Sequence, residues 1–333
     1  SRLPGNRPRT CSSRPADHLS REGDIPRPGV RRGGGYRFQV DYPPVDTFRQ
    51  YRFLLFPFVI GTIVLVALPA GLALGLSFTD YDALSAPNWV GLSNYTHLLD
   101  DRVFNIVLGN SIYFLVLSVP LRVLGAFGLA LWLGGERRGT GGYRAIVYLP
   151  TVIPDAATAL MWLWIVNPLY GPINLLLKSL GLPQPGWLAD HESARFVFVM
   201  IACLQIGEGF VVALSGLKGI PRSYYQAAQA DGAGALALFR HVTLPLALPW
   251  IALVAVRDTI FALPWTFAVS SIMTGGDPFY TTLFLPLYAR IQSVDYLKFG
   301  LGAAATTLMI LLAALALGLI GLAARRGWYA DEV

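Results

Sequence analysis

The sequence predicts an all-α integral membrane protein with six transmembrane helices. Apolar residues make up 54% of the 333 residues and charged residues only 14%, and the mean hydropathy is +0.51. A soluble domain carries about a quarter charged residues. The two cysteines, Cys11 and Cys203, are too few for a disulfide scaffold or a cysteine-rich zinc module.

Six apolar runs are long enough to cross the bilayer. A helix needs about 20 apolar residues to span ~30 Å of hydrocarbon. The first and last runs contain no charged residue, and the other four contain five between them. The predicted spans are residues 53–78, 103–133, 145–166, 196–214, 246–273 and 299–324.

Charged residues are distributed unevenly between the loops, which predicts the orientation of the chain. Cytoplasmic loops of membrane proteins carry an excess of Lys and Arg. Alternate segments between the spans are basic, with Arg49, Arg52, Arg137, Arg138, Arg144, Lys218, Arg222, Arg240, Arg325 and Arg326. The opposite loops carry Asp80, Asp82, Asp100, Asp101, Asp190, Glu192, Asp277 and Asp295. We therefore expect a multi-pass protein with both termini in the cytoplasm.

Residues 1–50 form a basic tail that is distinct from the transmembrane domain predicted over residues 51–333. The tail contains ten arginines and five acidic residues and is rich in Pro, Gly and Ser. It lacks the apolar periodicity needed to bury a core, so we expect it to be disordered. Contact with anionic lipid or RNA is one interpretation; the favoured one is an extension without a role in binding nucleic acid.

The loop between the fourth and fifth predicted spans contains a short helix. Pro221 suits the first turn of a helix, and Gly232 can end it in a left-handed conformation. Tyr224, Ala227, Ala228 and Asp231 then share one face. Because small residues allow close approach of a partner, this face is a predicted docking surface.

This loop resembles the "EAA" loop of ABC importer permeases, which reads Glu-Ala-Ala-x3-Gly-x9-Ile-x-Leu-Pro. The matching residues, at every spacing, are Gln226, Ala227, Ala228, Gly232, Val242, Leu244 and Pro245. Val242 in place of Ile is conservative. Gln226 in place of Glu removes a charge, so a salt bridge from this position is not expected, whereas a hydrogen bond is.

Further motifs resemble the sugar-transporting, maltose-type branch of that family. In chain order they are Leu149-Pro150 with Pro154, Trp162 and Trp164, Asn167-Pro168, Tyr170-Gly171, Ile173-Asn174, 187–190, 274–278 and 299–304. Asp277 stands where the branch has a Gly. The resemblance covers roughly residues 51–326 and implies a type I ABC importer permease bundle in the bacterial inner membrane.

The resemblance also implies partners and a coupling segment. Such a permease pairs with a second permease, two copies of an ATPase and an external binding protein that delivers the sugar. The segment 225–232 would dock on the ATPase, which binds ATP and Mg, so the chain itself is expected to hold no cofactor or metal and to have no catalytic residues. No lysine follows a glycine, so no Walker A sequence is present. The expected coupling residues are Tyr225, Gln226, Ala227, Ala228, Asp231, Gly232, Leu244 and Pro245.

Charged residues within the spans are expected either to line a polar substrate pathway or to form interhelical salt bridges, since an isolated charge in the bilayer costs a few kcal/mol or more. Adjacent helix positions point about 100° apart, so Arg257 and Asp258 are not expected to pair. An alternative for Asp155 is to satisfy backbone freed at Pro154. The candidate pathway residues are Arg122, Asp155, Glu208, Arg257, Asp258 and Trp265, with Asn110, Gln205, Ser270 and Ser271 as further hydrogen-bonding groups.

The sequence leaves the transported solute open. A carbohydrate is the preferred substrate, and a polyol or glycerol phosphate is the alternative within the family. A different class, an ion-coupled secondary transporter, would use Asp155, Glu208 and Asp258 as a proton relay but leaves the EAA spacing unexplained. A membrane enzyme has no catalytic constellation in this sequence.

Overall fold

The computed structural model describes residues 47–135 and 139–328. Within these ranges the chain forms α-helices, short 3₁₀ and π-helical turns, and one isolated antiparallel bridge between Thr79 and Trp89. The predicted all-α membrane fold is confirmed. The chain divides into two compact units, Ser1–Phe56 and Pro57–Val333, and most of the predicted tail, residues 1–46, lies outside the described residues.

Four stretches of helix are long and apolar enough to cross a membrane: Leu55–Leu76, Arg102–Leu133, Ala235–Met273 and Phe299–Ala324. These correspond to the first, second, fifth and sixth predicted spans. Their elements are α1 (Thr47–Thr62), η1 (Ile63–Ala67) and α2 (Leu68–Leu76), then α4 (Arg102–Leu133), then α11 (Ala235–Leu238), η3 (Phe239–Thr243) and α12 (Leu244–Met273), and finally α14 (Phe299–Trp328).

The third and fourth predicted spans are broken helices. Thr140–Val152 and Asp155–Ile165 meet at 100°, and Ser193–Leu204 and Gly207–Gly219 meet at 43°. If each bent pair counts as one span, the total is the predicted six. The pairs comprise α5 (Thr140–Tyr148), η2 (Leu149–Val152) and α6 (Asp155–Ile165), and α8 (His191–Leu204) and α9 (Gly207–Gly219).

Both breaks have a local cause. Pro154 has ψ 143° and precedes the first residue of α6, and proline has no N–H to continue a helical ladder. At the second break, Gln205 and Ile206 leave the helix before Gly207. A Cβ on Gly207 would lie 2.8 Å from Cα of Tyr148, so only glycine allows α9 to begin this close to α5.

Helix α4 supplies much of the core of the second unit. It packs against α8, α9 and α12, and α12 packs in turn against α6 and α14. Phe114 of α4, Phe198 of α8 and Phe284 are fully buried together, and the Phe284 ring meets the other two at 5.4–5.5 Å in tilted and edge-on arrangements. Asp101 caps α4 by accepting a hydrogen bond from the Val103 N–H at 2.9 Å. These contacts fix the central helix around which the charged residues are arranged.

Large apolar side chains also cover the outside of the helices. In the most apolar 18-residue stretches of Leu55–Leu76 and Phe299–Ala324, no residue is buried within the described chain. Exposed apolar surface of this extent is typical of contact with lipid or with another membrane subunit. The Gly71-x-x-x-Gly75 pattern meets no neighbour within 4 Å, so it does not pack closely within this chain.

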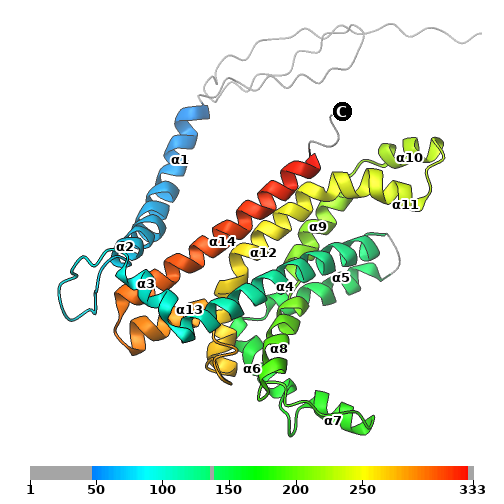
Figure 1. Cartoon of the computed structure of the whole chain (residues 1–333). Helices are drawn as coiled ribbons and strands as arrows, with labels where there is room; N and C mark the ends of the chain where they lie inside the picture. The colour runs from blue at the N-terminus through cyan, green and yellow to red at the C-terminus, as the bar shows by residue number, and fades with distance from the viewer. Residues whose placement is uncertain (1–46, 136–138, 329–333) are drawn as a thin grey trace, which may run out of the picture. The chain divides into compact units, whose positions relative to one another are not determined.

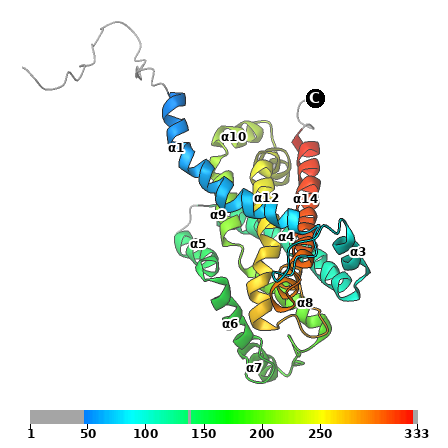
Figure 2. The same ribbon diagram turned by 90° about the vertical axis from the view of Figure 1, so that its left-hand side faces the viewer.

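The connecting helices lie at two ends of the second unit. In Figures 1 and 2, α10 (Arg222–Ala230) and the C-terminal end of α14 lie at one end, and α7 (Pro172–Ser179) lies at the other. The remaining elements are α3 (Ser93–Asp100), α13 (Leu285–Arg290) and η4 (Ile291–Asp295). Helix α10 thus lies at the opposite end of the second unit from α7.

Candidate functional site

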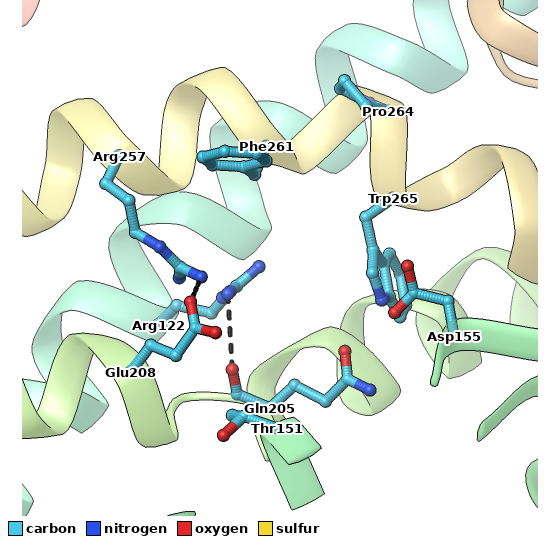
Figure 3. Close-up of a pocket in the computed structure, with 9 residues that line it drawn as sticks. All are labelled: Arg122, Thr151, Asp155, Gln205, Glu208, Arg257, Phe261, Pro264 and Trp265. Atoms are coloured by element: carbon cyan, nitrogen blue, oxygen red, sulfur yellow. Dashed lines mark hydrogen bonds and ion pairs between the residues drawn. The ribbon is translucent and has the colours of Figure 1, made fainter. Parts of the chain in front are cut away.

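A cavity of about 430 Å³ lies between α4, α9, α12 and the bent third segment. This volume lies within the range of small-molecule sites. Figure 3 shows its lining: Arg122, Thr151, Asp155, Gln205, Glu208, Arg257, Phe261, Pro264 and Trp265. Five of the six candidate pathway residues line this cavity, and the sixth, Asp258, forms ion pairs with two of them. The structure therefore gathers residues that are up to 143 positions apart in the sequence (Arg122 to Trp265).

The charged residues form a continuous chain of ion pairs. Oδ1 of Asp258 lies 3.3 Å from Nη2 of Arg122 and 2.7 Å from Nη1 of Arg257. Arg257 also pairs with Glu208 across from α12 to α9. Asp258 and Arg122 are buried, whereas Arg257 and Glu208 are partly exposed. The expected interhelical salt bridges are present and lie at the cavity wall, and the role of these residues in a substrate pathway stays a prediction.

The expectation that Arg257 and Asp258 do not pair is wrong. Their Cα–Cβ bonds diverge as adjacent helix positions must, but the long arginine side chain turns back to reach the neighbouring carboxylate. The guanidinium also lies 5.6 Å from the ring centre of Phe261, one turn along α12. A cation at this distance from an aromatic face is attracted to it, which helps to hold Arg257 at the cavity.

Asp155 and Trp265 form a second part of the lining. Asp155 is the first residue of α6, and Figure 3 shows its carboxylate beside the Trp265 indole. It forms no ion pair with any residue in the described part of the chain. The Trp265 ring stacks on Phe114 at 5.8 Å with an angle of 8° between the planes. This position makes Asp155 a cavity group and gives no support to its alternative role in capping the broken backbone.

Two hydrogen-bond donors at this wall are unused. Nε of Arg122 and Nε1 of Trp265 are buried and have no hydrogen-bond partner among the described residues. Leaving a buried donor unpaired costs about 1–3 kcal/mol, so such groups are usually satisfied by water or a ligand. Both nitrogens are closed off from the cavity, whose lining offers the carboxylate acceptors of Asp155 and Glu208.

Gln205 lines the cavity through the break between α8 and α9. Its carbonyl accepts from Nη2 of Arg122 at 3.3 Å, and its side chain donates to Oγ1 of Thr158 at 3.2 Å. Two other proposed hydrogen-bonding residues have different roles. Asn110 donates to the carbonyls of Tyr280 and Leu283, and Ser270 donates to that of Thr282. They hold the turn after α12 and do not line the cavity.

Three lining residues were not predicted: Thr151, Phe261 and Pro264. Phe261 and Pro264 follow Arg257 at helical spacings of four and seven, which place them on the same face of α12. That periodicity was a usable signal. Thr151 enters only because the third segment folds back at Pro154, and nothing in an apolar run indicates the angle of such a bend.

The predicted loop helix is present as α10, Arg222–Ala230, directly after Pro221. Gly232 has φ +84°. Its N–H donates to the Gln229 carbonyl at 3.0 Å, and the next N–H, of Ala233, donates to the Ala228 carbonyl at 3.0 Å. This pair of bonds is the Schellman C-cap, in which glycine avoids the steric cost of a left-handed residue. The predicted helix and its glycine stop are confirmed.

The proposed coupling residues divide into an exposed set and an anchoring set. Gln226, Ala227, Asp231 and Gly232 are exposed, whereas Tyr225, Ala228, Leu244 and Pro245 are half-buried. Tyr225 is hydrogen-bonded through its hydroxyl to Oγ1 of Thr243 at 3.1 Å, and Leu244 and Pro245 begin α12. One face of α10 is thus free for a partner while the other is tied to the end of α12.

Comparison with known proteins yields a family and a fold. Residues 126–328 match the family described as "Binding-protein-dependent transport system inner membrane component". The sn-glycerol-3-phosphate transport system permease protein UgpA of Agrobacterium fabrum (strain C58) is 30% identical over 78% of this chain and 88% of that protein. The trehalose/maltose transport system permease protein MalF of Thermococcus litoralis is 31% identical over 78% and 88%.

A solved structure has the same fold. It is that of a bacterial ABC transporter involved in the import of the acidic polysaccharide alginate, and it is 20% identical to this chain. It matches with a TM-score of 0.72 and covers 84% of this chain and 98% of that chain. At this identity the likeness shows the fold, and it confirms the permease bundle that the sequence motifs indicated.

Proposed function

The chain belongs to the family of inner-membrane components of binding-protein-dependent transport systems, and on this premise we propose that it is the permease subunit that carries a carbohydrate across the membrane. In the proposed assembly it pairs with a second permease and two copies of an ATPase that binds ATP and Mg. An external binding protein delivers the sugar. Both termini and α10 face the cytoplasm in this arrangement, which agrees with the basic residues of those segments.

The observation that carries the proposal is the connection between the loop helix and the cavity. Helix α10 lies in the loop between α9 and α12. Glu208 at the start of α9 pairs with Arg257 of α12, so the two helices that flank α10 also carry the ion pair at the cavity. A displacement of α10 by a docked ATPase would be transmitted through these helices to the proposed substrate pathway.

The cavity chemistry suits a polyhydroxylated solute. A sugar presents many hydroxyl groups, each able to donate and accept, and the lining supplies the carboxylate acceptors of Asp155 and Glu208 beside the guanidinium groups of Arg122 and Arg257. Aromatic rings at Phe261 and Trp265 offer apolar faces for the C–H surfaces of a sugar ring. The relative UgpA, named for glycerol phosphate, keeps a polyol or glycerol phosphate as the second candidate. The ion-coupled alternative is not retained, because the family works with binding proteins.

A first experiment tests the assembly. The tagged chain would be purified in mild detergent from its native cells, and the co-purifying chains identified by mass. A second multi-span permease and an ATPase with a Walker A sequence are expected. A homo-oligomer without an ATPase would contradict the proposal.

A second experiment tests the coupling segment through Gly232. Replacement by Leu forces a side chain into φ +84°, which should break the C-cap of α10. The matched control is Gly234→Leu, since Gly234 has an ordinary extended backbone (φ −75°, ψ 172°) and no neighbour within 4 Å. We expect Gly232→Leu to lose ATPase retention and sugar uptake while Gly234→Leu keeps both. Equal retention in the two variants would refute the coupling role.

A further inference from the structure

The charges around the cavity are not balanced. Two arginines face three carboxylates, which gives a formal charge of −1 for the set Arg122, Arg257, Asp155, Glu208 and Asp258. We propose that this arrangement makes the cavity selective for polyhydroxylated ligands without negative charge, and that Asp155 and Glu208 are the residues that exclude phosphorylated or carboxylated sugars. The inference rests on the proposed function and names the substrate class of the same site.

Both guanidinium groups are already committed to protein carboxylates. Arg122 is held by Asp258 at 3.3 Å, and Arg257 is shared between Asp258 at 2.7 Å and Glu208. Arginine binds phosphate or carboxylate strongly through a fork of N–H groups aimed at two oxygens. Both terminal nitrogens of Arg257 are occupied in this way, and Nη2 of Arg122 is shared between Asp258 and the Gln205 carbonyl, so an anionic ligand would have to displace Glu208 or Asp258 before it gained the Arg257 fork.

The remaining groups favour a neutral ligand for a separate reason. Asp155 has no cationic partner in the described part of the chain and lies beside the Trp265 indole (Figure 3). A carboxylate in this position accepts hydrogen bonds from hydroxyl groups but repels another anion. A like charge about 6 Å away, at an effective dielectric constant of about 20, weakens binding by about a hundredfold. Asp155 thus favours hydroxyl-rich ligands and disfavours phosphates at once.

Hydrogen-bond acceptors complete the recognition. The carboxylates of Asp155 and Glu208 line the cavity, and an ionised carboxylate only accepts hydrogen bonds, which hydroxyl and ammonium groups can donate. The lining therefore matches a neutral sugar or polyol, and the same chemistry would admit a sugar with an ammonium group.

The test uses three ligands that share one ring and differ in charge: glucose, glucosamine and glucose 6-phosphate. Binding to the purified nucleotide-free transporter, without its binding protein, is measured by saturation-transfer NMR, which detects weak ligands. We expect signals from glucose and glucosamine and at least tenfold weaker binding of glucose 6-phosphate. Binding of glucose 6-phosphate as tight as that of glucose would overturn the inference.

Two variants test the inference through an expected gain in binding of glucose 6-phosphate. Glu208→Gln releases Arg257 from one partner, and Asp155→Asn removes the uncompensated charge. Each is expected to tighten glucose 6-phosphate binding at least tenfold, an outcome that misfolding cannot produce. The control is Asp295→Asn, which removes a carboxylate paired with Arg290 at 3.1 Å outside the cavity and should leave the ligand pattern unchanged.

The outcomes separate the inference from the proposed function. If the unmodified chain binds glucose but neither variant gains glucose 6-phosphate, the roles of Asp155 and Glu208 are refuted while the sugar pathway stands. If the unmodified chain binds none of the three ligands, the cavity is not a sugar site and the proposed function fails with the inference.

Discussion

Asp258 is the position at which the ion-pair chain is most sensitive to mutation. The residue is 1% exposed, and one oxygen, Oδ1, lies 3.3 Å from Nη2 of Arg122 and accepts a hydrogen bond from Nη1 of Arg257 at 2.7 Å. Asp258→Asn preserves the shape but removes the charge. Arg122, only 6% exposed, would lose its carboxylate and keep only neutral acceptors, the Gln205 carbonyl and the asparagine amide oxygen. Removing one partner of a buried ion pair costs about 3–5 kcal/mol, because an uncompensated charge remains.

The matched change is Arg122→Met. It removes the other member of the buried pair, but Asp258 retains Arg257 at 2.7 Å and no unpaired buried charge is left. Methionine also fills much of the arginine volume with apolar atoms, and apolar replacement of a buried charge is well tolerated when its partner stays neutralised. The structure therefore predicts a marked asymmetry, with Asp258→Asn much more destabilising than Arg122→Met.

Thermal unfolding of the purified complex in detergent, followed by tryptophan fluorescence, measures this asymmetry. At an unfolding entropy of about 2.1 cal/mol/K per residue, a loss of ~3 kcal/mol lowers Tm by roughly 4 °C in a chain of 333 residues. Asp295→Asn is the control, because its exposed pair with Arg290 should be worth at most about 1 kcal/mol. Equal shifts for Asp258→Asn and Arg122→Met would show that Arg257 does not share the carboxylate and would refute the reasoning.

Two further predictions concern helix packing and the turn beyond α12. A Cβ on Gly216 would collide with the Trp250 ring, so Gly216→Ala should lower the free energy of unfolding by about 1–3 kcal/mol. Gly219 has no neighbour within 4 Å, so Gly219→Ala should lower it less in the same unfolding assay. Equal losses of stability in the two variants would contradict this prediction. Burial and a 3.0 Å hydrogen bond to Asp101 raise the pKa of Tyr288. Because folding favours the protonated phenol, the stability of the protein should fall as pH rises above about 10. The same fall in a Tyr288→Phe variant would contradict this prediction.

Much of the fold follows from the sequence because the length of the apolar runs and the positions of proline and glycine determine where the helices begin and end. Runs of about 20 apolar residues can satisfy their backbone in lipid only as helices, and four of the predicted spans are such helices. Pro221 and Gly232 set the start and end of α10 as expected. The same reasoning could not give the bend of 100° at Pro154, because proline marks where a helix stops and leaves the next direction to tertiary contacts.

The charged residues of the cavity lining were predictable, but their pairing was not. A charge in an apolar span has to face protein or water, which correctly singled out Arg122, Asp155, Glu208 and Arg257. Which charge meets which depends on how α4, α9 and α12 pack and on how far an arginine side chain extends, and helical geometry gives only the direction of its first bond. This is why the Arg257–Asp258 contact was missed. Arg257 joins the buried Asp258 to the partly exposed Glu208 of α9. In the proposed mechanism, any separation of α9 from α12 must therefore break Arg257 away from one of its two carboxylates.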